Sequence, residues 1–318
     1  MIERFRHLLA IEPLSAAQIA FLLDEARPFQ QMQTYPLKKL ATLRGKSVVL
    51  AFFEPSTRTR ISFTAAAGRL GADTLGLQAE SSSLKKGESL ADTIHTLEAM
   101  KPDGIVIRHS SSGAAEFVAE RVRVPVINAG DGLHEHPTQA LLDALTIRDR
   151  RGSLDGLAIT ILGDIVHSRV ARSDIHLLSK FGARITLCGP AMWLPRELDT
   201  LAPGVRRTTR IDEALEGAEA VMALRVQEER LHEPGLPRDE YIRQYQLSRA
   251  RLARACPGAL VLHPGPMIRG LEIEPAVADG PQSCVLEQVT NGIAVRMALL
   301  YLLIGGTGSL EDLSHASA

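Results

Sequence analysis

The sequence predicts an α/β protein with two domains, each a parallel β-sheet flanked by helices. Short apolar runs of strand length alternate with amphipathic stretches of helical length along most of the chain. Such alternation is typical of parallel sheets that are covered by helices on both faces. The chain has 318 residues, which is long for a single hydrophobic core and favours two domains.

The strands are expected where apolar runs are continuous, because a strand of a parallel sheet is buried on both faces. These runs are residues 47–53, 104–107, 124–127, 157–162, 184–187, 220–224 and 260–262. Helical periodicity fills the intervals between them. Examples of the predicted helices are residues 60–70, 89–100, 137–150 and 169–181.

The alternation restarts after a polar, glycine-containing stretch at residues 150–153, which predicts a domain boundary near residue 150. The first domain is then residues 1–150 and the second residues 151–285. An apolar helix at residues 282–304 either ends the second domain or crosses back to the first. We expect the C-terminal helix, over about residues 286–305, to pack on the first domain.

Composition and charge exclude several classes of protein. The formal net charge of −1 creates no overall field that attracts nucleic acid or an anionic membrane. Cys188, Cys256 and Cys284 are too scattered for a disulfide framework or a metal cluster. Charges at the amino terminus do not fit a signal peptide, and Arg296 interrupts the most apolar late stretch. A cytoplasmic protein without membrane or nucleic-acid partners is expected.

A polar segment follows the first strong strand at the point where a helix begins. Its residues Ser56, Thr57, Arg58 and Thr59 are here called the phosphate seat. Backbone N–H groups and the positive end of the helix dipole bind phosphate at such a position, and hydroxyls with a guanidinium add donors. The alternative is that Ser56 or Thr57 only caps the helix. The carboxyl edge of a parallel sheet is where α/β proteins bind ligands, which favours the phosphate site.

The phosphate seat lies in the string F-x-E-P-S-T-R-T-R-x-S-F at residues 52–63. This string resembles the carbamoyl-phosphate signature of the aspartate and ornithine carbamoyltransferases, and the resemblance extends over residues 5–305. It implies that the phosphate seat binds carbamoyl phosphate and that Arg58 and Thr59 are catalytic. The string identifies the family and does not choose the amino-acid substrate.

Polar residues also follow the next two predicted strands, at Arg108 and at the segment His134-Glu135-His136-Pro137. Two histidines suggest a metal site, but no cysteine or third histidine lies near them in the sequence. Pro137 places His136 near a helix N-terminus, which disfavours the protonated imidazole. The resemblance implies that Arg108, His136 and Thr59 hold the carbonyl oxygen of carbamoyl phosphate as an oxyanion hole, with Gln139 on its amide.

A polar loop at residues 81–89 leads into a predicted helix. By its residues alone it is either an exposed loop ending in a capping serine, Ser89, or part of a site. The resemblance implies that Ser82 and Lys86 reach the active site of a neighbouring subunit, and that Lys86 also contacts aspartate. A site shared in this way requires an oligomer, and the family forms homotrimers.

Two arginines follow strands of the second domain, Arg169 after residues 157–162 and Arg225 after residues 220–224. Guanidinium groups bind carboxylates in bidentate geometry, so this pair fits a dicarboxylate. Solvated surface arginines are the alternative. The first of these junctions lacks the G-x-G-x-x-G pattern of a dinucleotide site, so nucleotide binding is a weak alternative.

The resemblance selects aspartate rather than ornithine at two segments. The string R-V-Q, which contains Arg225 and Gln227, matches the aspartate-binding segment of the family. The string H-P-G-P, which contains Gly265 and Pro266, matches the aspartate branch, whereas ornithine enzymes carry a cysteine after that histidine. The chain departs from the expected asparagine at Asp174 and at Ile268.

The implied reaction is attack of the L-aspartate amine on the carbamoyl carbon, giving N-carbamoyl-L-aspartate and phosphate, an early step of de novo pyrimidine biosynthesis. The motifs supply no metal ligand set, cofactor site or covalent nucleophile. In the family a glutamate beside the seat pairs with second-domain arginines on domain closure, which maps to Glu54 with Arg169 and Arg230. Open alternatives are an ornithine enzyme and a catalytically silent assembly partner. A regulatory chain or dihydroorotase is a further expected partner.

Overall fold

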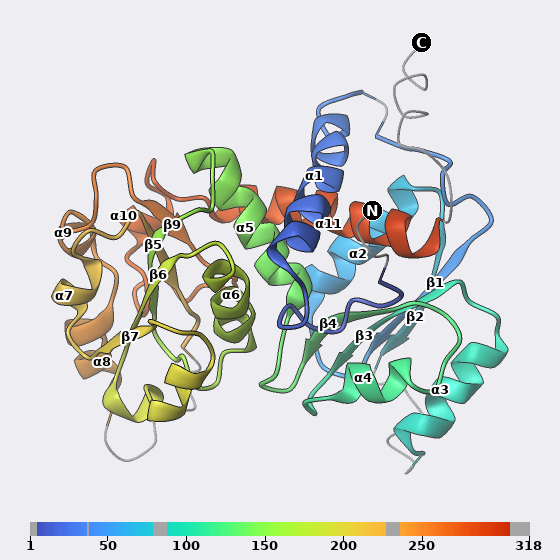
Figure 1. Ribbon diagram of the computed structural model, residues 1–318, viewed down its shortest axis with the longest axis horizontal. Coiled ribbons are helices and arrows are strands. Elements are labelled where there is room, and N and C mark those ends of the chain that lie inside the picture. The colour runs from blue at the N-terminus through green and yellow to red at the C-terminus, as the bar shows by residue number, and fades with distance from the viewer. Residues whose placement is uncertain (1–4, 37, 79–87, 227–235, 306–318) are drawn as a thin grey trace. The chain divides into compact units, whose positions relative to one another are not determined.

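The computed structural model describes residues 5–36, 38–78, 88–226 and 236–305 (Figure 1). The chain forms two compact units. The first is Met1–Leu141 together with Thr290–Ala318, and the second is Leu142–Val289. The chain passes from one unit to the other within helix α5 (Pro137–Arg151) and again within helix α11 (Val285–Ile304).

The first unit is built on a four-stranded parallel sheet with the order β2-β1-β3-β4. The strands are β1 (Ser47–Phe52), β2 (Asp73–Gln78), β3 (Gly104–His109) and β4 (Val126–Asp131). Helices α3 (Leu90–Ala99) and α4 (Ala114–Ala119) pack their apolar side chains on one face of β1, β3 and β4. Figure 1 shows α1 (Ala16–Met32) and α2 (Thr57–Arg69) on the opposite side of this sheet.

The second unit is built on a five-stranded parallel sheet with the order β7-β6-β5-β8-β9. The strands are β5 (Ala158–Leu162), β6 (Arg184–Cys188), β7 (Arg206–Thr208), β8 (Ala220–Ala223) and β9 (Leu260–Leu262). Its helices are α6 (Arg169–Ser179), α7 (Ile211–Leu215), α8 (Arg238–Tyr245), α9 (Arg249–Leu252) and α10 (Pro275–Ala278), with short 3₁₀ turns at Ala191–Trp193 and Arg196–Thr200. One core cluster joins β5, β6, β8 and β9 to α7 and α8 through buried side chains.

The predicted α/β fold class is confirmed, and every predicted apolar run overlaps a strand of one of these two parallel sheets. The boundary predicted near residue 150 stays a prediction. The same holds for the roles that the resemblance implies, carbamoyl-phosphate binding by residues 1–150 and aspartate binding by residues 151–285. The three cysteines are free thiols. Within the described ranges no helix is long and apolar enough to cross a bilayer.

Sequence reasoning did not name strands β2 and β7 or helices α1, α4, α7, α8, α9 and α10. Strands β2 and β7 lie at the edges of their sheets and are not continuously apolar, and Leu75 of β2 is exposed. Helix α1 had a detectable signal, because Ser15 and Gln18 form a capping box. The hydroxyl of Ser15 accepts the N–H of Gln18, and the amide oxygen of Gln18 accepts the N–H of Ser15.

Candidate active site

The phosphate seat and Arg108 both lie at the carboxyl ends of strands in the first unit's sheet. Strands β1 and β3 are neighbours, and Phe52 at the end of β1 is in register with Arg108. The N–H of Phe53 donates to the carbonyl oxygen of Arg108 over 2.8 Å. Because the strands are parallel, the residues that follow β1 begin beside the side chain of Arg108.

Helix α2 begins at Thr57, and Ser56 occupies its N-cap position. The hydroxyl of Ser56 makes no capping hydrogen bond, so the interpretation of Ser56 as a helix cap does not describe its side chain. Thr57 and Arg58 are exposed, whereas Thr59 is buried. The first turn of α2 therefore presents hydroxyls, a guanidinium and the helix N-terminus, which is the arrangement that binds a phosphate dianion.

The guanidinium of Arg108 lies between the segment after β1 and the end of β4. Its Nε lies 3.4 Å from Oε2 of Glu54, and its Nη1 donates to the carbonyl oxygen of Ala129 over 3.1 Å. The side chain is only 12% exposed. A positive charge is thus held in place beside the phosphate seat by one carboxylate and one carbonyl.

Helix α5 begins at Pro137, directly after His136. His136 and Gln139 are buried, and the N–H of Gln139 donates to the carbonyl oxygen of His136 over 2.9 Å. Proline suits the first helical position because its missing N–H would have no partner inside the helix. The predicted carbonyl and amide ligands of carbamoyl phosphate therefore share one helix start in the first unit.

Sequence reasoning missed Arg296, which it treated only as an interruption of an apolar stretch. This residue of α11 is 4% exposed, and its Nη1 donates to Oγ of Ser62 over 2.8 Å. Its Nη2 contacts Oγ1 of Thr138 at 3.4 Å, and its Cζ lies 5.2 Å from the ring centroid of Phe63. Arg296 thus links α2, which carries the phosphate seat, to the first turn of α5.

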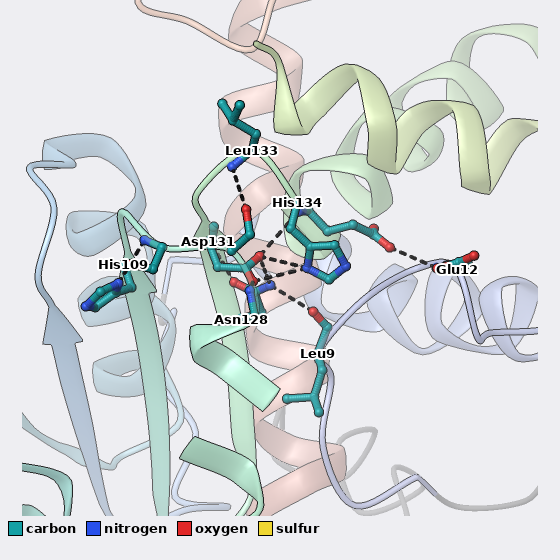
Figure 2. Close-up of polar contacts among 12 residues, drawn as sticks. Leu9, Glu12, His109, Asn128, Asp131, Leu133 and His134 are labelled. Carbon is teal, nitrogen blue, oxygen red and sulfur yellow. Dashed lines mark hydrogen bonds and ion pairs between the residues drawn. The ribbon is translucent and has the colours of Figure 1, made fainter. Parts of the chain in front are cut away.

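His134 pairs with a carboxylate. Its Nδ1 lies 3.1 Å from Oδ2 of Asp131, and this hydrogen bond raises the pKa of His134 (Figure 2). Burial by itself raises the pKa of Asp131, but hydrogen bonds from His134 and Asn128 outweigh burial, and that pKa is lowered. In the part of the chain that the structure describes, no group of three or more His, Cys, Asp or Glu side chains is arranged to hold a metal.

In the second unit, Arg169 and Arg225 follow neighbouring strands. Leu162 of β5 is in register with Ala223 of β8, and the N–H of Leu224 donates to the carbonyl oxygen of Leu162 over 2.8 Å. Arg169 is the first residue of α6 and is half-buried, while Arg225 is exposed. Both residues thus follow the carboxyl ends of neighbouring strands of the second sheet, a placement that is compatible with a dicarboxylate site.

The segment with Gly265 and Pro266 follows β9, the neighbour of β8. The N–H of Gly265 donates to Nδ1 of His263 over 2.8 Å, and Nε2 of His263 lies 3.1 Å from Oε1 of Glu272. Both side chains are buried. Gly265 has φ of +67°, a conformation that glycine adopts without strain.

The structure also places Ser89 and the two residues that depart from the family pattern. Ser89 caps α3, since its hydroxyl accepts the N–H of Asp92 over 3.1 Å. Of the two departures from the family pattern, Asp174 is buried in α6 and Ile268 packs against the core of the second unit. Four predicted site residues lie outside the described ranges: Ser82, Lys86, Gln227 and Arg230.

Two family models match the chain. Residues 6–149 match the carbamoyl-P binding domain of aspartate/ornithine carbamoyltransferases. Residues 155–303 match the Asp/Orn binding domain of the same family. The two matches cover nearly all of the described structure.

Relatives of known name support the same family. The aspartate carbamoyltransferase catalytic subunit of Solibacter usitatus is 59% identical over 298 residues, covering 94% of this chain and 99% of that protein. The corresponding subunit of Syntrophotalea carbinolica is 54% identical over 308 residues, covering 96% and 97%.

Solved structures have the same fold. An aspartate transcarbamoylase from Trypanosoma cruzi in complex with carbamoyl phosphate and aspartate aligns with a TM-score of 0.85 at 31% identity, covering 95% of this chain and 96% of that one. An ornithine carbamoyltransferase from Pyrococcus furiosus aligns with a TM-score of 0.84 at 28% identity, covering 95% and 98%. The fold alone therefore does not separate the two substrates.

Proposed function

Because this chain belongs to the aspartate/ornithine carbamoyltransferase family, we propose that it carbamoylates L-aspartate with carbamoyl phosphate, giving N-carbamoyl-L-aspartate and phosphate. This reaction is an early step of de novo pyrimidine biosynthesis. The observation that carries the proposal is the gathering of the phosphate seat and Arg108 at one sheet edge, with Glu54 and Ala129 holding Arg108. Aspartate is favoured over ornithine by the R-V-Q and H-P-G-P strings and by the names of the two relatives described above.

The phosphate seat binds the phosphate of the first substrate through the hydroxyls of Ser56, Thr57 and Thr59, the guanidinium of Arg58 and the helix N-terminus. Each hydrogen bond to a charged group contributes about 1.5–3 kcal/mol. Three or four of them are enough for micromolar binding, which requires about 8 kcal/mol.

The carbamoyl oxygen accepts hydrogen bonds from Arg108, His136 and Thr59, and Gln139 contacts the carbamoyl amide. The neutral amine of aspartate forms the new C–N bond, and negative charge develops on this oxygen in the tetrahedral intermediate. The intermediate collapses by breaking the C–O bond to phosphate, and the departing phosphate takes the amine proton. The enzyme contributes charge stabilisation and the alignment of two substrates.

Aspartate is bound through its carboxylates by Arg169, Arg225, Gln227 and Lys86. Bidentate pairing of guanidinium with carboxylate supports the roles of the two arginines. The segment with Gly265 and Pro266 borders the same substrate, as the family resemblance implies. An amine substrate with a cationic side chain, such as ornithine, would meet unfavourable charge at these arginines.

A direct assay tests the proposed reaction. The purified chain is incubated with carbamoyl phosphate and either L-aspartate or L-ornithine, and phosphate and the carbamoylated amino acid are measured. We expect product with aspartate and none above background with ornithine. Carbamoylation of ornithine would assign the chain to the other branch, and no transfer to either amine would support a silent assembly partner.

A homotrimer with shared sites is part of the proposal, since the resemblance places Ser82 and Lys86 of one subunit in the site of the next. Trimers of Lys86→Ala and trimers of Arg58→Ala are each expected to be inactive. After dissociation and joint reassembly, some sites contain neither substitution, so measurable activity should return. Each variant dissociated and reassembled alone is the control. If hybrid trimers form but no activity returns, each active site is made by a single subunit.

Glu54 is proposed to pair with Arg169 and Arg230 when the substrates are bound. Glu54→Ala is expected to lower kcat about 10-fold, the lower end of the value of one charged hydrogen bond, with little change in the KM for carbamoyl phosphate. Glu54→Gln separates this role from the contact with Arg108, because glutamine keeps an acceptor but no charge. A normal kcat in Glu54→Gln would show that the charge of Glu54 is not needed for pairing with Arg169 and Arg230. The role of Glu54 would then be limited to holding Arg108. The exposed Glu120 supplies a control, Glu120→Ala.

The remaining partners rest on the resemblance alone. A regulatory chain or a dihydroorotase is proposed as a binding partner, and the cytoplasm as the location, which suits three free cysteines. Measurement of the molecular mass of the purified chain, alone and mixed with each candidate partner, tests the assembly.

A further inference from the structure

Two turns at the edge of the first sheet are joined by hydrogen bonds, and each turn adjoins a proposed carbonyl donor. The first, residues 109–113, directly follows Arg108, and the second, residues 131–135, directly precedes His136. The N–H of Gly132 donates to the carbonyl oxygen of His109 over 2.9 Å. The N–H of Leu133 donates to Oγ of Ser112 over 3.1 Å, as Figure 2 shows.

The fit between the two turns leaves no room for a side chain at Gly132. A Cβ atom there would lie 2.4 Å from the backbone nitrogen of Ser112 and 3.0 Å from the carbonyl oxygen of Ser110. Gly132 also has φ of +48°, in the left-handed region. The contact is therefore a close backbone approach with one defined geometry.

The carboxylate of Asp131 is the centre of this contact and is 2% exposed. Its Oδ2 accepts the N–H of Gly113 in the first turn over 2.7 Å. Its Oδ1 accepts the side-chain amide of Asn128 over 2.7 Å and the N–H of Glu135 over 3.2 Å. One buried carboxylate thus joins the end of β4 and both turns, and these partners are all donors.

Glu135 secures the second turn from its other side. Its buried carboxylate accepts the N–H of Ile11 over 2.9 Å and the N–H of Glu12 over 3.0 Å. Asn128 binds the same amino-terminal segment through the carbonyl oxygen of Leu9, at 2.8 Å. The second turn is therefore fixed between the first turn and residues 9–12, immediately before His136.

We propose that Asp131 is a positioning residue for carbamoyl transfer, holding the turn after Arg108 against the turn before His136 and so fixing the spacing of the two carbonyl donors. The inference rests on the proposed function, because it assigns both donors to the developing oxyanion. Asp131 itself does not contact the substrate in this account. Its replacement is expected to lower kcat, because the developing oxyanion needs hydrogen bonds from Arg108 and His136 at the same time.

The test is Asp131→Asn, compared with Asp103→Asn. Asparagine places an NH₂ group among hydrogen-bond donors and therefore breaks at least one contact of the original carboxylate. Asp103 serves as the control, because its carboxylate also accepts a backbone N–H, that of Ser47 at 2.8 Å. This contact lies at the amino ends of the strands of the same sheet, whereas Asp131 lies at their carboxyl ends. The measurements are kcat, the inhibition constant of inorganic phosphate and the thermal unfolding midpoint.

For Asp131→Asn we expect kcat to fall about 10- to 100-fold, as a displacement near 1 Å can produce. The inhibition constant of phosphate should change less than about 3-fold, because the phosphate seat lies on other segments. Asp103→Asn should lose stability with kcat nearly unchanged. Equal kcat in the two folded variants, or an equal loss of phosphate binding and kcat, would overturn the proposal. An inactive wild-type chain would instead refute the proposed function.

A milder variant keeps the proposal testable if Asp131→Asn does not fold. Ser112 is exposed, so Ser112→Ala should fold while removing the acceptor of the Leu133 N–H. The expected loss is about 3-fold in kcat, again without weaker phosphate binding. The neighbouring Ser111→Ala is its control, since within the described residues the hydroxyl of Ser111 makes no hydrogen bond. Normal kcat in Ser112→Ala, with Asp131→Asn unfolded, would also count against the proposal.

Discussion

Arg108→Met is expected to lower kcat by about 10²- to 10³-fold, the usual effect of removing one oxyanion donor. Methionine keeps much of the apolar stem but removes the charge that lies between Glu54 and the carbonyl oxygen of Ala129. The KM for carbamoyl phosphate should rise much less, because the phosphate seat remains. Steady-state kinetics with both substrates varied give the two constants.

Two further variants complete this test. Arg108→Lys keeps the charge but cannot reproduce the planar fork of donors, so an intermediate kcat is expected. Arg121→Met is the control, as Arg121 is a partly exposed arginine of the same unit that lies over the ring of Phe117. A decrease below about 3-fold for Arg108→Met would exclude Arg108 from the oxyanion hole.

Arg225→Met is expected to raise the KM for aspartate about 10- to 150-fold, equivalent to the 1.5–3 kcal/mol of a hydrogen bond to a charged group. Arg225 is exposed at the end of β8, so its loss should not disturb the core of the second unit. The KM for carbamoyl phosphate should stay within about 2-fold of the wild-type value. Initial rates at saturating carbamoyl phosphate measure the first effect.

Arg210→Met is the matched control for Arg225, because Arg210 is 74% exposed and pairs with Glu213 on the same unit. It should change neither KM. An equal rise of both KM values in Arg225→Met would indicate a general disturbance rather than lost recognition of a carboxylate. An unchanged KM for aspartate would mean that Arg225 is a solvated surface arginine that does not bind aspartate.

The central strands were predictable because each is a continuous apolar run that is buried on both faces. β1 and β8 are examples, with nearly every residue buried. Edge strands lack this signal: β2 exposes Leu75, and β7 is the polar sequence Arg-Arg-Thr. Whether an apolar or a polar residue enters an edge strand depends on its neighbours in space, which sequence periodicity does not report.

The phosphate seat and Arg108 were predictable for a different reason. The carboxyl ends of parallel strands lie at one sheet edge, so residues that follow β1 and β3 must meet. Arg296 and Glu135 were not predictable, because their partners are distant in sequence. Arg296 contacts Thr138 across 158 residues, and Glu135 contacts Ile11 across 124 residues.

The discontinuity of the first unit has a consequence for synthesis on the ribosome. Arg296 contacts Ser62 across 234 residues. At about 5–20 residues per second, roughly 10–50 s of translation separate the two. The whole of Leu142–Val289 is synthesised in that interval. The second unit is therefore synthesised before the part of α11 that belongs to the first unit, Thr290–Ile304, which carries Arg296.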